Sequence, residues 1–164
     1  MHVLGRLIFG GACALLLSGA AAEAADLSCG GETPTRLNVR VTGVQSSQGL
    51  IAVSLYGNDP SKFLKHHGSL GTVRVSAQAP STQVCLALPK PGQYAVAVYH
   101  DLNGDRKLNL RFFLPAEPFA LSNNPPPRRV FPSIGPSLFT THEGENSIHV
   151  SLEKAPKDGD GKGG

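Results

Sequence analysis

The sequence predicts an all-β protein, an antiparallel β-sandwich of about seven strands with one short helix and a long ordered loop. Several short segments alternate apolar and polar residues, which is the period of a half-buried strand. Turn residues separate these segments every ten residues or so, as is typical of sandwiches. The chain has 19 Gly, 13 Pro and no Trp, a composition that favours a turn-rich β domain over a helical one.

The N-terminus has the features of a signal peptide covering residues 1–25. Arg6 is followed by an apolar run at Leu7–Leu17, and Ala22-Glu23-Ala24 fits the pattern of a cleavage site. The run is shorter than the roughly 20 residues that cross a bilayer. We therefore expect export to the periplasm or the extracellular space, with no transmembrane segment in the mature chain.

The mature chain has the length of one domain. We expect a polar lead-in segment at 26–34, the sandwich at 35–153, and a Gly- and charge-rich tail at 154–164 that is disordered. The net charge is +3, and the basic residues are scattered rather than gathered in a stripe. This distribution argues against nucleic-acid binding.

Two cysteines remain after signal cleavage, Cys29 and Cys85. Two cysteines in an exported chain favour one disulfide, the alternative being two free buried thiols. Cys85 falls on the strand face opposite Val84 and Leu86. A Cys29–Cys85 bond would therefore tie the lead-in segment to a sheet rather than join two sheets through the core.

Each of the main predicted strands has an apolar residue at every second position. The strands are expected at Thr35–Val44, Leu50–Tyr56, Thr72–Gln78, Thr82–Leu88, Gln93–His100 and Ser147–Glu153. A short polar turn joins the first two, so the pattern predicts a hairpin there.

One segment favours a helix. Asn58 or Asp59 can cap it, Pro60 suits its first turn, and Lys62–His67 supplies about a turn and a half. We expect Phe63 and its neighbour Leu64 to pack on the edge of the sandwich.

Residues 101–140 lack sustained periodicity, and only Asn109–Leu114 and Ser137–Thr141 have the pattern of short strands. A segment this long is usually functional or disordered. Five of the seven Phe lie within it, and such a density of aromatic side chains favours an ordered loop that packs on the sandwich.

The loop after the Gln93–His100 strand has oxygen-bearing side chains at every second position. Asp101, Asn103 and Asp105, with Asn109 further on, can turn several oxygens toward one Ca²⁺ ion. An EF-hand fits poorly, because its sixth position would be Arg106. The alternative, which we favour because of that positive charge, is a polar turn whose side chains bond their own backbone.

The sequence identifies no catalytic group. His100 with Glu117 or Ser122 would make a hydrolase only if the fold brought them together, and no G-x-S-x-G turn is present.

Three blocks, YAVAVYHDLNGDRKLN, PAEPFALSNN and GPSLF, resemble the exported bacterial domain of unknown function 2141. The resemblance covers roughly Leu37 to Leu152. Arg106 stands where the family usually has Gly, and Asn109 where it has Asp. The resemblance implies an immunoglobulin-like or transthyretin-like sandwich and no known enzymatic activity. We expect the matched residues to anchor the loop or to bind a partner; they are His100, Glu117, Ser122, Asn123 and Asn124.

On these observations we predict a non-catalytic exported protein, a binding or structural module of the cell envelope with an unidentified ligand or envelope protein as partner. A calcium-stabilised domain and a hydrolase are the alternatives.

Overall fold

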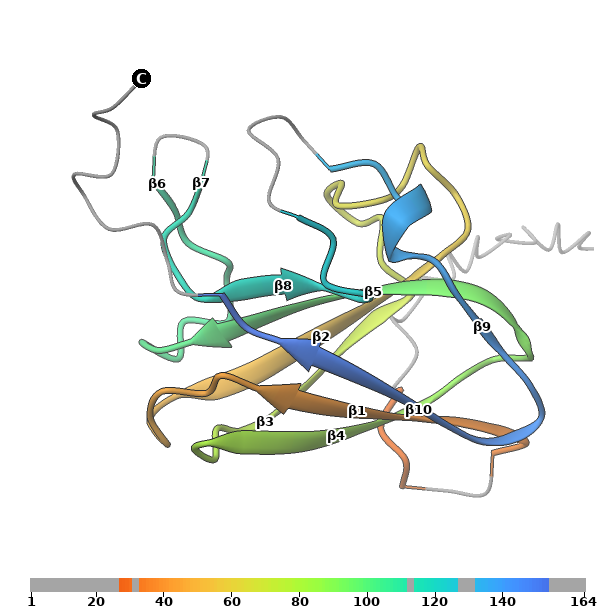
Figure 1. Ribbon diagram of the computed structural model, residues 1–164, viewed down its shortest axis with the longest axis horizontal. Coiled ribbons are helices and arrows are strands. Elements are labelled where there is room, and N and C mark those ends of the chain that lie inside the picture. The colour runs from red at the N-terminus through yellow and green to blue at the C-terminus, as the bar shows by residue number, and fades with distance from the viewer. Residues whose placement is uncertain (1–26, 31–32, 112–113, 127–131, 154–164) are drawn as a thin grey trace, which may run out of the picture.

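Two β-sheets pack face to face, with strands from distant parts of the chain side by side (Figure 1). The computed structural model describes residues 27–30, 33–111, 114–126 and 132–153. The predicted all-β sandwich is confirmed.

The smaller sheet has the strand order β10-β1-β4. It consists of β1 (Thr35–Thr42), β4 (Ser81–Ala87) and β10 (Gly144–Ser151). β4 is antiparallel to β1, whereas β10 is parallel to it. β10 enters beside the start of β1, where the amide of Gly144 donates to the carbonyl of Pro34 (2.8 Å). The sandwich is therefore not wholly antiparallel.

The larger sheet has the order β3-β2-β5-β8, and β9 pairs with the start of β5. Its strands are β2 (Leu50–Gly57), β3 (Gly71–Ser76), β5 (Gly92–Asp101), β8 (Phe119–Leu121) and β9 (Phe139–Thr141). Two more strands, β6 (Leu110–Arg111) and β7 (Leu114–Pro115), form a small separate hairpin.

The predicted hairpin between the first two strands is wrong, because β1 and β2 lie in different sheets. Both strands carry fully buried apolar residues, such as Val39 of β1 and Val53 of β2, in the same core cluster. Because β1 and β2 face each other across the core, these side chains are buried and their apolar surface is removed from water.

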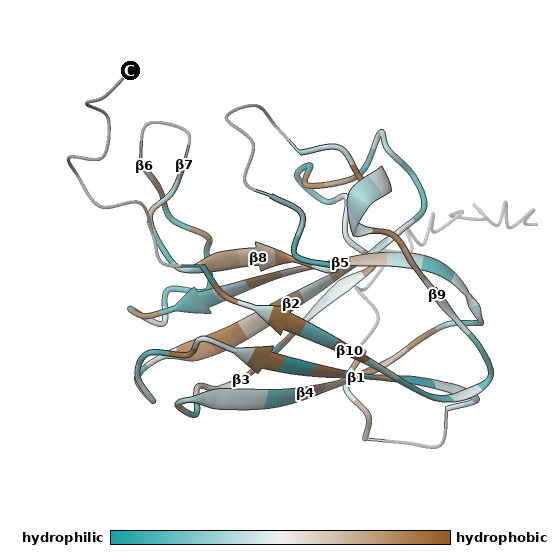
Figure 2. Ribbon diagram, in the orientation of Figure 1, coloured by the Kyte–Doolittle hydropathy of each residue, from teal (hydrophilic) through white to brown (hydrophobic). Residues whose placement is uncertain are grey.

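The most hydrophobic residues are concentrated on the strands (Figure 2). The main cluster lies between the sheets and includes Val96 and Val98 of β5. A second cluster, with Ala95 and Ala97 of the same strand, lies on the outer face of the larger sheet. β5 is therefore buried on both faces, which makes it the central support of the fold.

The predicted helix after Asn58 is wrong. Residues 60–67 form turns, with Leu64 and His67 at φ 55°. These positive values interrupt helical geometry. Phe63 is nevertheless buried, and its ring packs edge-on against Tyr56 at 5.2 Å between centroids. The segment therefore covers the outer face of the larger sheet rather than its edge.

The disulfide between Cys29 and Cys85 is present, with the Cα atoms 5.6 Å apart. The lead-in segment also pairs with β4, because Ser28 bridges Leu86 and the amide of Ala87 donates to the carbonyl of Leu27 (2.7 Å). As predicted, the bond ties the lead-in to one sheet.

The predicted signal peptide and tail lie outside the described residues, as do Phe112, Phe113 and Phe131 of the Phe-rich loop. In the part of the chain that is described, no helix is long and apolar enough to cross a membrane.

Candidate functional site

The loop that follows β5 is organised by the carboxylate of Asp101. This side chain is fully buried. Its two oxygens accept the amides of Asp105 (3.1 Å) and Arg106 (2.8 Å). The loop therefore folds back over the residue that begins it, as an Asx-type turn does.

Two residues of the loop have left-handed backbone, Gly104 at φ 72° and Arg106 at φ 63°. This region favours Gly, because a Cβ atom meets steric resistance there. Arg106 therefore holds a backbone conformation that its Cβ atom disfavours, and its amide bonds the Asp101 carboxylate in that conformation.

Asp105 is the second acidic centre of the loop. Its carboxylate accepts the amide of Lys107 (2.9 Å) and the side-chain amides of Asn103 and Asn109 (3.1 Å each). The Lys107 amide, followed by the Asn109 side chain, holds the pKa of the Asp105 carboxyl below its usual range. Asp105 is exposed, so an ionised carboxylate faces solvent at this loop.

The loop closes on Glu117, which is buried just before β8. Its carboxylate accepts the amides of Leu102 and Asn109 (3.2 Å each). One side chain thus holds both ends of the loop.

His100 lies next to Asp101 but on the other face of β5, in line with the core residues Val96 and Val98. It is fully buried, and its Nε2 lies 2.8 Å from the carbonyl of Gln48 in the β1–β2 connection. Its Nδ1 has no hydrogen-bond partner among the described residues. His100 therefore fastens the connection at residues 43–49 to the end of β5.

The Ser122-Asn123-Asn124 segment anchors the chain that follows β8. The hydroxyl of Ser122 bonds Val96 of β5 and the carbonyl of Ser137. Asn123 donates to the carbonyls of Pro136 (3.1 Å) and Leu138 (2.9 Å), and Asn124 bonds both main-chain groups of Ser151. Both Asn residues have positive φ, 64° and 42°. This conformation suits Asn better than most residues.

The groups considered for hydrolysis do not converge. His100 is in β5, and Ser122 lies opposite Val96, four residues earlier in the same strand, which corresponds to about 13 Å along a strand. The amide of His100 donates to the carbonyl of Pro118, so Glu117, one residue before Pro118, has its side chain on the other face of the sheet from His100. General acid–base catalysis needs such groups within hydrogen-bond reach, so the geometry does not support a hydrolase.

The four side chains considered for calcium do lie together, since Asp105 contacts both Asn103 and Asn109 and its amide bonds Asp101. Within the described ranges, no group of three or more His, Cys, Asp or Glu residues has the arrangement of a metal site. The carboxylates of Asp101 and Asp105 accept hydrogen bonds from main-chain amides of the loop. This is the arrangement of the polar turn, the alternative interpretation of the sequence.

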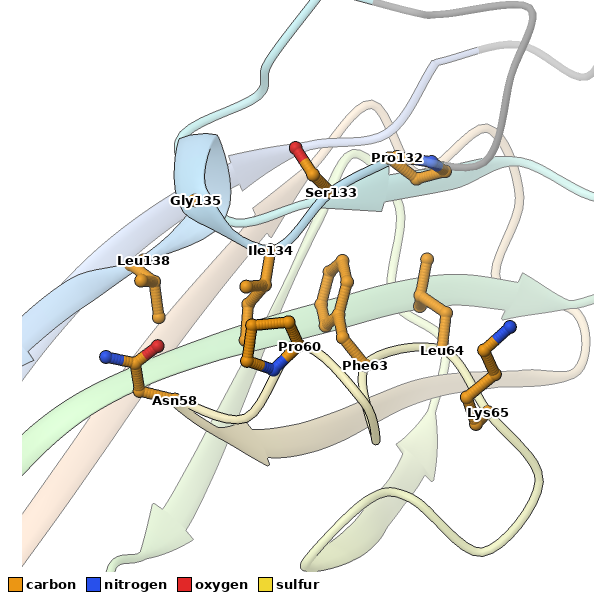
Figure 3. A pocket seen from close by; sticks show the side chains of 10 residues that line it. All are labelled: Asn58, Pro60, Phe63, Leu64, Lys65, Pro132, Ser133, Ile134, Gly135 and Leu138. Carbon is orange, nitrogen blue, oxygen red and sulfur yellow. The ribbon is translucent and has the colours of Figure 1, made fainter.

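A pocket of about 610 Å³ lies on the outer face of the larger sheet. Its walls are the turn segment at residues 58–65 and the segment 132–138, which contains the short 3-10 helix η1 (Gly135–Ser137). In Figure 3, Ile134 extends toward Pro60 and Leu138 toward Asn58, both on the other wall. The sequence did not reveal this pocket, because residues 58–67 had the pattern of a helix and residues 132–138 had no pattern.

The comparison with protein families gave one match. A family model described as "Uncharacterized protein conserved in bacteria (DUF2141)" matches residues 39–149, a range that contains β2 to β9, half of β1 and most of β10. Comparisons with curated proteins and with solved structures gave no match.

Proposed function

We propose that this chain, which belongs to the DUF2141 family of uncharacterized bacterial proteins, is a non-catalytic binding protein exported to the cell envelope. The observation that carries this proposal is how the acidic and polar residues of the 101–141 segment are used. Asp101, Glu117 and Ser122 all bond main-chain groups, so they fix the shape of a surface rather than face a reacting atom.

Export is supported by two features of the chain. The first 25 residues have the pattern of a signal peptide. The Cys29–Cys85 disulfide joins the lead-in to β4, and stable disulfides are typical of oxidising compartments such as the periplasm. Both features support the proposal that the mature chain acts outside the cytoplasm.

The pocket on the outer face of the larger sheet is the proposed binding surface. Phe63, Leu64, Ile134 and Leu138 supply apolar walls, and the polar side chains of the lining are those of Asn58, Lys65 and Ser133. A concave, mainly apolar surface with a few polar groups is the usual form of a ligand site. The ligand class that fits is a small molecule or side chain with an apolar part.

Binding at this pocket is testable by NMR titration of the ¹⁵N-labelled mature protein with phenol and isopropanol as apolar probes. We expect shift changes to cluster at Leu64, Ile134 and Leu138, because these side chains line the pocket. Leu64→Ser should weaken probe binding by about tenfold, which corresponds to the roughly 1.4 kcal/mol expected from lost apolar contact.

The matched control is Leu70→Ser, since Leu70 is an exposed leucine (42%) that does not line the pocket. It should bind the probes as the unmodified protein does. Shift changes scattered over the surface, or equal losses in both variants, would argue against a ligand site here. Mass spectrometry of the protein from the periplasm tests export, and a chain that keeps residues 1–25 or stays in the cytoplasm would contradict it.

A calcium-stabilised domain is the second candidate. It is favoured by the contact of the Asp105 carboxylate with the side chains of Asn103 and Asn109. Rotating these two amides by half a turn would replace their donor nitrogens with oxygens, which are ligands that Ca²⁺ accepts. Arg106 and Lys107 oppose the site electrostatically.

Thermal unfolding with calcium and with a chelator tests this candidate. At a calcium concentration 100 times the dissociation constant, binding to the native state alone adds about 2.7 kcal/mol of stability. The melting temperature should rise in calcium, and Asp105→Asn should reduce the rise because it removes an anionic ligand. An identical melting temperature in both buffers would remove calcium from consideration.

A further inference from the structure

One long edge of the smaller sheet has backbone groups that face outward. β10 bonds β1 through its even-numbered residues, as the amides of Gly144 and Leu152 show by donating to Pro34 and Thr42. In a strand, the amide and carbonyl of one residue point to the same side, and the next residue's point to the other. The odd-numbered residues of β10 therefore direct their main-chain groups away from β1. Figure 1 shows β10 on the side of β1 opposite β4.

This outer edge is closed at one end. The Asn124 side chain bonds the amide (3.0 Å) and the carbonyl (2.6 Å) of Ser151. The preceding outward positions of β10 are all exposed; they are Glu145, Ser147 and His149. In the described part of the chain, no strand pairs with the edge of β10 that faces away from β1. The edge thus offers a row of three residues with outward amides and carbonyls, which is a template for another strand.

Two other outer edges, those of β4 and β3, are protected. The lead-in segment covers the end of β4 and is fixed there by the disulfide. β3 carries Arg74 at its middle outward position, an exposed charge of the kind that keeps edges apart. Between Gly144 and His149, β10 has no Lys, Arg or Pro.

We propose that this edge pairs with β10 of a second copy of the chain. In an antiparallel pair with the two-fold axis at Ser147, Ser147 meets its own copy and Glu145 lies opposite His149 of the partner subunit. A carboxylate opposite an imidazole is a favourable cross-strand pair. The same arrangement of β3 would place two Arg74 side chains opposite each other, which is unfavourable. Within the chain Glu145 also contacts Asn38 and Arg36, and the His149 ring bonds Thr42. What separates the two edges is the like-charge contact that a β3 pair would make and a β10 pair avoids.

The proposed pairing joins two three-stranded sheets into one six-stranded sheet. Three residue pairs with two bonds each give about six main-chain hydrogen bonds. Ile148, which is partly buried against the core, would lose further exposure beside the partner subunit's Asn146. A contact of one strand edge is small, so we expect a dimer that forms at about 0.01–1 mM.

The first test is Ser147→Cys in the mature protein, whose other two cysteines are already bonded to each other. In the dimer the two introduced residues have Cα atoms about 5.5 Å apart, within the range that a disulfide spans. Mild oxidation should give a covalent dimer on a non-reducing gel. The control is Ser76→Cys, an exposed position on the outward edge of β3. We expect this variant to cross-link at least about tenfold more slowly than Ser147→Cys. A tenfold ratio corresponds to a preference of roughly 1.4 kcal/mol for the β10 edge.

The second test uses proline and sedimentation velocity. Ser147→Pro removes an amide that faces away from β1, so the monomer keeps its β1–β10 ladder. The dimer should be lost, while Ser76→Pro should leave it unchanged. A protein that is monomeric at all concentrations, or equal cross-linking of the two Cys variants, would overturn the proposal. If a chain ending at residue 153 dimerises and the full chain does not, the tail rather than a second copy occupies the edge.

Discussion

Breaking the Cys29–Cys85 disulfide is expected to lower the free energy of unfolding by about 4 kcal/mol. The bond joins residues 56 positions apart. Opening a loop of this size gives the unfolded chain much more conformational freedom, and the loop-entropy relation yields this value. Since domains are stable by about 5–15 kcal/mol, the loss is a large part of the total.

The native state also loses contacts when the bond is broken. Leu27 of the lead-in is buried (7% exposed) in the main core cluster, and its carbonyl accepts the amide of Ala87. Without the disulfide, the contacts that remain between the lead-in and the sandwich include this pairing, the burial of Leu27 and the Ser28–Leu86 bridge. We therefore expect the lead-in to leave β4 before the sandwich unfolds.

Urea unfolding of the mature protein with and without a reducing agent measures the effect. The double variant Cys29→Ser, Cys85→Ser should match the reduced protein and should not respond to the reducing agent, which controls for other effects of the reagent. A loss under 1 kcal/mol in the double variant would mean that the cross-link restricts the unfolded chain far less than its length predicts.

The strands could be predicted because burial of one strand face against the core decides which residues are apolar. In β1, Leu37, Val39 and Val41 are fully buried and the residues between them are not, which is the pattern of a strand with one face on the core. The apolar residues at both alternating positions of β5 indicated a strand, and the structure buries both of its faces. Predicted and observed bounds of these strands differ by only a few residues.

Sheet membership was not predictable in the same way. β1 and β2 are adjacent in sequence and alternate as hairpin strands do, but alternation does not say which neighbour a strand pairs with. The short β8 was missed, since its three residues are too few to establish a period. The Asn58–His67 segment had the cap and Pro of a helix start, and packing of Phe63 on the sheet outweighed this local preference.

The candidate site was predictable in part. The spacing of Asp101, Asn103 and Asp105 identified the loop, and the polar turn was one of its two interpretations. The partner of the loop, Glu117, was named, but its bonds to the amides of Leu102 and Asn109 depend on β8 lying beside β5. The contact between the end of β5 and the β1–β2 connection could not be predicted from local sequence patterns, because it joins residues some 50 positions apart.

A close approach in the same region makes Gly49→Ala the second large expected loss of stability, about 2–5 kcal/mol. Gly49 has φ 75°, and a Cβ atom there would overlap the carbonyl oxygen of Asp101 and lie 3.0 Å from the Cα of Leu102. The left-handed conformation itself costs about 1–2 kcal/mol for a residue with a Cβ. Displacing the packed backbone of residues 101–102 adds about 1–3 kcal/mol.

Gly104→Ala is the matched control for this prediction. Gly104 has nearly the same conformation, φ 72°, and no heavy atom within 4 Å of the position of its Cβ. Its loss should be only the conformational term, about 1–2 kcal/mol. Urea unfolding of both variants separates the two costs. Equal losses of unfolding free energy would mean that the close approach of Gly49 to the Asp101 backbone adds no cost. A larger loss at Gly49, with NMR shift changes at residues 101–109, would mean that this connection holds the start of the loop in place.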